Sequence, residues 1–103
     1  MYMKAFKTAY TIPFPPDVII RIEHVIERGR VVEFVVQLEV KGKPVKRYDT
    51  AHGFAHIDRY NLKGKQKKER LYLGYNTALT FAERDIKQNW LIYRERFLRG
   101  EWP

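Results

Sequence analysis

Two stretches in which apolar and polar side chains alternate limit the folds open to this chain more than any other feature. Apolar residues recur at every second position over residues 18–26, with His24 in one of these positions, and again over residues 32–40. Alternation with a period of two is typical of strands that bury one face of a sheet. The tripeptide at 28–30 lies between the two stretches, and its glycine readily adopts the positive φ angle of a tight turn. Residues 18–40 are therefore predicted to form a β-hairpin.

Turn signals divide the following segment into further strands. The segments 41–44 and 61–64 combine lysine, asparagine, glycine and proline in the way that tight turns favour. A charged loop is expected over residues 65–70. The additional strands are predicted at residues 45–50, 54–60 and 71–73, the last of them short.

The hydrophobic period changes to that of a helix near residue 76. From there apolar side chains recur three or four positions apart and form one stripe along a helix. Asn76 is a favourable N-terminal cap and Gly100 a favourable stop, so the helix is predicted over residues 77–99. The expected fold class is α+β: an antiparallel sheet of four to five strands with one long C-terminal helix packed on one face.

The 103 residues are predicted to form a single domain, because a chain of this length with 45% apolar residues supports one core. Residues 1–16 are expected to be an extended N-terminal arm or edge strand, followed by an antiparallel sheet over 17–75 and the helical segment over 76–100. The sequence has no cysteine, shows no signal peptide and lacks the run of ~20 apolar residues that a membrane span requires. A cytoplasmic protein without a membrane partner is expected.

A strong positive charge indicates an anionic partner. Lys and Arg number 20 against 12 Asp and Glu, so the formal net charge is +8. If the strands pair in chain order, the turn at 41–44 and the loop at 61–70 emerge at one end of the sheet and form one basic surface. RNA is the favoured partner, while an acidic protein and a merely solvated surface are the alternatives. The residues predicted to bind nucleic acid are Lys41, Lys43, Lys63, Lys65, Lys67, Lys68 and Arg70.

Chemically capable side chains are concentrated in residues 47–60, which hold two of the three histidines with two Asp, two Arg and two Tyr. The alternation of a regular strand breaks down near Gly53, so a bulge or tight bend is expected there. In a purely structural interpretation, Asp49 and Thr50 cap a turn and the histidines bond to the backbone. In the alternative interpretation the segment forms a site.

As a site, this segment is suited to acid–base cleavage of RNA. One imidazole can take the proton of the 2′-hydroxyl while another protonates the leaving oxygen, and an arginine can stabilise the phosphoryl transition state. A carboxylate can orient one of the imidazoles. The predicted catalytic residues are Arg47, Asp49, His52, His56 and Arg59.

A metal site is disfavoured by the spacing of the two histidines, and no cofactor is predicted. On a straight strand His52 and His56 would lie ~13 Å apart, which is too far for both to bind one ion. A bend at Gly53 would bring them closer, with Asp49 and Asp58 as further ligands.

The segment Arg47-Tyr48-Asp49-Thr50-Ala51-His52-Gly53, followed by His56 and Asp58, resembles the signature of a family of small uncharacterised prokaryotic proteins. The helix region around 78–97 is similar to that family as well, and the resemblance carries no function. More distantly, residues 47–58 resemble the TumE-like toxins of type II toxin–antitoxin modules. This second resemblance favours RNA cleavage and implies an acidic, antitoxin-like protein partner.

Together these observations favour a small basic protein that acts on nucleic acid, as a metal-independent ribonuclease of toxin–antitoxin type. The alternative is a non-catalytic domain that binds nucleic acid or an acidic protein. A third interpretation is a structural or assembly protein whose histidines only support the fold. The sequence leaves the oligomeric state open, and a dimer is compatible with it.

Overall fold

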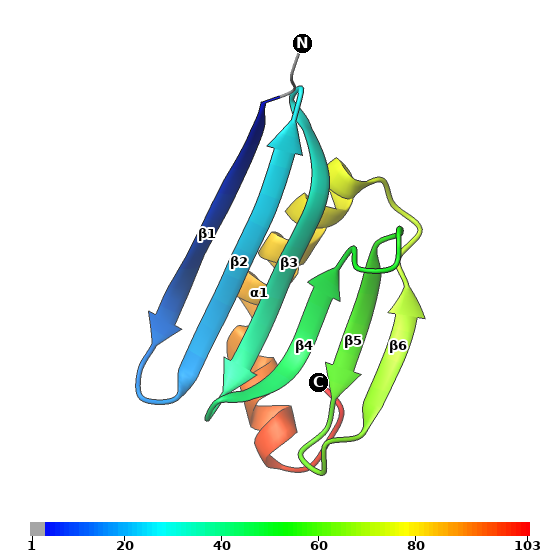
Figure 1. Cartoon of the computed structure of the whole chain (residues 1–103). Coiled ribbons are helices and arrows are strands. Elements are labelled where there is room, and N and C mark those ends of the chain that lie inside the picture. The colour runs from blue at the N-terminus through cyan, green and yellow to red at the C-terminus, as the bar shows by residue number, and fades with distance from the viewer. Residues whose placement is uncertain (1–3) are drawn as a thin grey trace.

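The computed structural model describes residues 4–103, which form one six-stranded antiparallel sheet and one helix (Figure 1). The sheet is a simple meander in which each strand pairs with the next one along the chain. Its strands are β1 (Ala5–Phe14), β2 (Val18–Glu27), β3 (Arg30–Val40), β4 (Lys43–Asp49), β5 (His56–Tyr60) and β6 (Gln66–Arg70). The helix α1 (Tyr75–Leu98) crosses one face of this sheet.

The α+β class, the antiparallel sheet and the C-terminal helix are confirmed, but the strand count of four to five is wrong. The predicted hairpin is present as β2 and β3, which turn at Arg28 and Gly29, both with positive φ. The N-terminal arm contributes a full edge strand, β1, which pairs with β2 along its whole length. The first three residues of that arm lie outside the described residues.

The other edge of the sheet also differs from the prediction. The segment 66–70, expected to be a charged loop, is strand β6, whereas residues 71–73 form no strand. Every residue of β6 is exposed, so it has no alternating pattern by which a strand could be recognised. Backbone pairing with β5 alone defines it.

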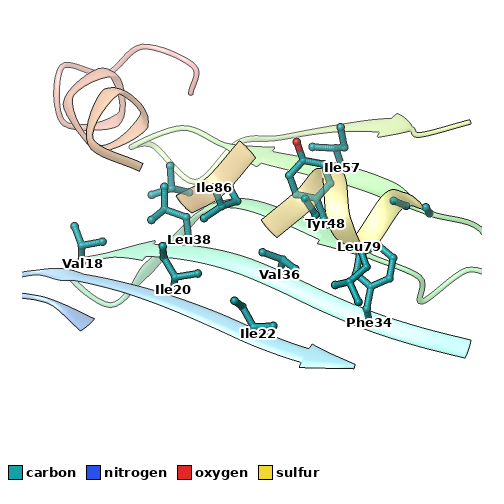
Figure 2. Close-up of a cluster of buried hydrophobic side chains, with 14 of the residues drawn as sticks. Val18, Ile20, Ile22, Phe34, Val36, Leu38, Tyr48, Ile57, Leu79 and Ile86 are labelled. Carbon is teal, nitrogen blue, oxygen red and sulfur yellow. The ribbon is translucent and has the colours of Figure 1, made fainter. Parts of the chain in front are cut away.

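The hydrophobic core lies between α1 and the middle strands of the sheet. Side chains from β2, β3 and β4 face the helix, and several of them are fully buried (Figure 2). Of the predicted helix stripe, Ile86 and Phe97 are buried, while Trp90 is half-buried and stacks on Phe14 with ring centroids 4.3 Å apart. Among residues 4–103, α1 is the one helix, and it is not long and apolar enough to cross a membrane.

The start of the helix differs from the expected capping. Gly74 takes the N-cap position, and among the described residues no side chain makes a capping hydrogen bond to this end of the helix. Asn76, predicted as the cap, instead accepts a hydrogen bond from the N–H of Val31 at 3.0 Å through its Oδ1. This bond attaches the first turn of α1 to the start of β3.

A buried polar network fastens α1 to β4. Lys46 Nζ donates to Asp85 Oδ2 at 2.8 Å, and Tyr48 and Tyr93 each donate a hydroxyl hydrogen bond to Asp85 at 2.5 Å. Burial lowers the pKa of Lys46. Burial works against ionisation of Asp85 too, but the bonds from Lys46, Tyr48 and Tyr93 outweigh it and lower its pKa. The network holds Lys46 and Tyr48 against the helix and thereby fixes which side of β4 faces away from it.

Candidate functional site

Strand alternation places the chemically rich residues on the sheet face that α1 leaves uncovered, called here the open face. Because Lys46 and Tyr48 point to the helix, their neighbours Arg47 and Asp49 point to the open face. The register of β4 and β5 sets Asp49 opposite His56. The same register sets Arg47 opposite Asp58. Three predicted catalytic residues and the candidate metal ligand Asp58 are therefore neighbours on two adjacent strands.

Two carboxylates converge on one ring nitrogen of His56. Its Nε2 lies 2.6 Å from Asp49 Oδ1 and 3.5 Å from Asp58 Oδ2. Its Nδ1 lies 3.4 Å from the carbonyl oxygen of Phe54. Arg47 Nε donates to the other oxygen of Asp49 at 2.5 Å. His56, Asp49 and Asp58 are only 3%, 4% and 4% exposed, although no helix covers this face.

A loop at 50–55 brings His52 back over this group. Gly53 has a φ of 82°, and its N–H donates to the carbonyl of Thr50 at 3.2 Å, so the chain reverses within a few residues. The ring centroids of His52 and His56 are consequently 5.2 Å apart. The separation of ~13 Å expected for His52 and His56 on a straight strand, which disfavoured a metal site, is therefore wrong. The bend predicted at Gly53 is confirmed. We call Arg47, Asp49, His52, His56 and Asp58 the open-face cluster.

The turn-capping role expected of Asp49 is present, whereas the side chain of Thr50 bonds across to β3 instead of capping the turn. Asp49 Oδ1 accepts a hydrogen bond from the N–H of Ala51 at 3.2 Å, and Thr50 Oγ1 accepts one from the N–H of Phe34 at 3.1 Å. Asp49 therefore shapes the loop that carries His52 and also contacts His56. The structural and chemical interpretations of this segment are compatible.

Arg59 does not join the open-face cluster. It follows Asp58 on β5, pairs with Lys46 across the sheet and therefore lies on the face that α1 covers. Its guanidinium donates to Glu69 at 2.7 Å. The structure thus brings together four of the five predicted catalytic residues and leaves out Arg59.

The predicted nucleic-acid-binding residues fall into separate groups. Lys68 and Arg70 of β6 lie on the open face, where Lys68 Nζ is 3.9 Å from Asp58 Oδ1 and Arg70 stacks over Phe54 at 4.6 Å. Lys67 points to the other face and lies 4.3 Å over the ring of Trp102. The remaining residues sit at or beside the β3–β4 and β5–β6 turns, at the far end of β5 from His56: Lys41, Lys43, Lys63 and Lys65.

An open cleft of about 260 Å³ adjoins the open-face cluster. Arg47, Asp49 and Thr50 form one side of it. Lys7, Glu23 and Glu33, from β1, β2 and β3, complete its charged lining. These three residues were not predicted, because only the strand register brings them to the same cleft as Asp49.

A chain of hydrogen bonds extends from the cluster across the open face. Arg47 Nη1 donates to Gln37 Oε1 at 3.0 Å, and Gln37 Nε2 donates to Glu39 Oε2 at 2.8 Å. Arg21 also donates to Glu39. These residues were not predicted, although the alternation in 32–40 already assigned Gln37 and Glu39 to the polar face of their strand.

Three residues of the cluster have the donor types and spacing of a metal site. One ligand atom from each of Asp49, His56 and Asp58 can be chosen so that all three lie within 4.8 Å of one another. Within residues 4–103, Asp58 Oδ1 is one of two buried side-chain polar atoms without a hydrogen-bond partner. The other is Nδ1 of His24, on the helix side of β2.

Comparisons with known proteins identify a family without extending the function. Neither a curated protein nor a solved structure matches the chain significantly. One family model matches residues 3–102, which is nearly the whole chain, and its description is Domain of unknown function (DUF7718). The chain therefore belongs to the DUF7718 family.

Proposed function

We propose that the protein binds RNA on the open face of its sheet and cleaves it at the open-face cluster. The observation that carries this proposal is the convergence of His52 and His56, with ring centroids 5.2 Å apart, over the carboxylate of Asp49. An exposed imidazole held beside a second imidazole that a carboxylate fixes in place can act as the general base of phosphodiester cleavage. The resemblance of residues 47–58 to TumE-like toxins supports the same activity, and an acidic antitoxin-like partner with it.

The two histidines have different roles in this proposal. His52 is exposed and meets the substrate, whereas both nitrogens of the buried His56 face protein oxygen atoms. His52 takes the proton of the 2′-hydroxyl as the O2′–phosphorus bond forms and the bond from phosphorus to O5′ breaks. Water protonates the leaving O5′, so the products are a 2′,3′-cyclic phosphate and a 5′-hydroxyl. His56 and Asp49 position the loop that carries His52.

Cations beside the cluster supply contacts for the phosphate backbone. Lys68 and Arg70 lie on the same face as His56, and the side chain of Arg47 is half-buried beside Asp49. Arg70 also stacks on Phe54 and on the exposed Tyr72, which gives an unstacked base an aromatic surface. The net charge of +8 adds long-range attraction for an anionic strand.

The test is cleavage of mixed RNA by the wild-type protein and by His52→Gln. We expect the substitution to lower the rate ~10²- to 10⁴-fold, the usual contribution of one positioned proton-transfer group. RNA binding should persist, because Lys and Arg make the phosphate contacts. His24→Gln is the histidine control. His24 borders the cleft, but its side chain points to the helix side of β2, so the rate of this variant should stay at the wild-type value.

Two results would contradict the proposal. Equal rates for the wild type and His52→Gln would remove His52 from the chemistry. Tight RNA binding with no cleavage by the folded wild-type protein would leave the non-catalytic binding domain as the better account.

A further inference from the structure

We propose that Asp49, His56 and Asp58 hold a divalent first-row metal ion between β4 and β5. The donor set is one imidazole nitrogen and two carboxylate oxygens, and the three ligand atoms lie within 4.8 Å of one another. Bonds of ~2.0–2.2 Å from such an ion set neighbouring ligand atoms roughly 3 Å apart. The distances from His56 Nε2 to the two carboxylates, 2.6 and 3.5 Å, lie on either side of that value.

In one of its two tautomers, His56 presents a lone pair to a cation at this position. When Nδ1 donates its proton to the carbonyl of Phe54, Nε2 of the neutral ring presents a lone pair. That lone pair faces carboxylate oxygens of Asp49 and Asp58, a contact that repels unless a positive charge lies between them. A backbone carbonyl on the distant ring nitrogen is the usual means of orienting a metal-binding histidine.

The unpartnered oxygen of Asp58 is an independent sign that a ligand is needed. Its side chain is 5% exposed, and its Oδ1 accepts no hydrogen bond from residues 4–103. Burying a carboxylate without a full set of partners is costly, so such groups bind metals or pair with cations. The cation that faces this oxygen, Lys68, is 3.9 Å away and half-exposed.

The cations beside the cluster hold its two carboxylates unequally. Arg47 neutralises one oxygen of Asp49 and leaves the other directed at His56. Lys68 is too far from Asp58 to hydrogen-bond. The two carboxylates, the guanidinium of Arg47 and the ammonium of Lys68 sum to no net charge, so a bound ion would displace the half-exposed Lys68 from Asp58.

The donor types indicate which ions fit. Imidazole favours Zn²⁺ and similar metals, while carboxylates are shared by Zn²⁺ and Mn²⁺, and an all-oxygen set would be needed for Ca²⁺ or Mg²⁺. We therefore expect Zn²⁺ and Mn²⁺ to bind and Ca²⁺ to bind poorly. The ion would lie beneath His52 and hold β4, β5 and the 50–55 loop in place, as a positioning cation rather than a reactant.

The experiment is calorimetric titration of chelator-treated full-length protein with Zn²⁺, Mn²⁺ and Ca²⁺, in the absence of RNA. We expect one Zn²⁺ or Mn²⁺ per chain, and a rise in Tm on binding. Asp58→Asn should weaken binding by at least about tenfold, since even outer-shell partners of metal ligands contribute that much. Glu23→Gln, a carboxylate of the neighbouring cleft, is the matched control and should bind as the wild type does.

The outcomes separate this inference from the proposed cleavage. Absence of Zn²⁺ and Mn²⁺ binding by the folded wild-type protein would overturn the metal site and leave His56 hydrogen-bonded to Asp49. Equal affinity in Asp58→Asn and Glu23→Gln would also overturn it. Because no RNA is present, neither result depends on whether the protein is a ribonuclease.

Discussion

Two buried charged clusters lie on opposite faces of β4 and differ in how completely their charged groups are paired and hydrogen-bonded. On the helix side, Lys46 contacts Asp85, which also accepts bonds from two tyrosine hydroxyls. On the open face, Asp49 of the same strand and its partner His56 meet a second carboxylate, Asp58. One strand therefore contributes alternate residues to both clusters.

This difference is the basis for proposing a site on the open face and a structural role for the helix-side cluster. The helix-side carboxylate has a cation and several hydrogen-bond donors, so nothing further is needed to stabilise its charge. The open-face cluster sets two carboxylates around one ring and leaves Asp58 Oδ1 without a hydrogen bond among the described residues, with the half-exposed Lys68 3.9 Å away. Natural proteins keep such unsatisfied buried groups where a ligand or a reaction requires them.

The largest effect is expected from breaking the helix-side cluster. Asp85→Ala leaves Lys46 as a buried charge without its carboxylate, so we expect a loss of ~3–5 kcal/mol in the free energy of unfolding, measured by chemical denaturation. The double variant Lys46→Met/Asp85→Leu removes both charges and should recover most of that loss. A double variant no more stable than Asp85→Ala would show that packing, not the ion pair, is responsible.

A smaller effect is expected in acid. The folded-state pKa of Asp85 lies below its ordinary value because hydrogen bonds from Lys46, Tyr48 and Tyr93 outweigh the opposing effect of burial. The stability that this carboxylate supplies is therefore present above the unfolded pKa and is lost as the pH falls through the folded pKa. The free energy of unfolding, measured at successively lower pH, should fall less steeply for Asp85→Asn than for the wild type. Parallel pH dependences would contradict this assignment.

The open face should differ from the far turns in binding RNA. RNA binding weakens as the salt concentration rises. Removing the charges of Lys68 and Arg70 together should make the fall of log K, the RNA association constant, with log salt less steep by ~0.7 for each phosphate that is no longer neutralised. Lys41→Gln/Lys43→Gln removes the same amount of charge at the β3–β4 turn and is the control. Equal slopes in the two double variants would show that charge alone, not the open face, determines binding.

The smallest effect on stability is expected at Asp58 of the open-face cluster. Asp58→Asn should change the free energy of unfolding by less than ~1 kcal/mol in metal-free buffer, because Oδ1 has no hydrogen bond to lose and the amide keeps the side-chain size. A loss as large as that of Asp85→Ala would show that this cluster, too, is a structural one.

The sequence was sufficient for the parts of the fold that have a periodic pattern. The period of two in 18–40 predicted β2 and β3, and the change of period near residue 76 predicted α1 to within a few residues. Neither edge strand had such a pattern, since β1 and β6 are exposed along nearly all of their length. A strand held mainly by backbone bonds cannot be recognised from its side chains.

The site was predicted in its residue types and only partly in its geometry. Residues 47–60 were identified because unlike polar groups were crowded there, and the bend at Gly53 was expected from the broken alternation. The register, which no local pattern specifies, sets Asp49 opposite His56 and sends Arg59 to the other face. Long-range contacts such as those of Asp85 with β4 likewise depend on how the helix crosses the sheet.

We infer that the open face, and not the helix side, carries the proposed function. The decisive experiment maps backbone amide chemical shifts during titration with short single-stranded RNA. We predict that the perturbed residues will cluster in 47–58 and around Lys68 and Arg70, while those facing Asp85 and the outer surface of α1 stay unchanged. Chemical-shift perturbations centred on α1 would contradict this inference. So would the absence of any perturbation at RNA concentrations that saturate other small basic RNA-binding domains.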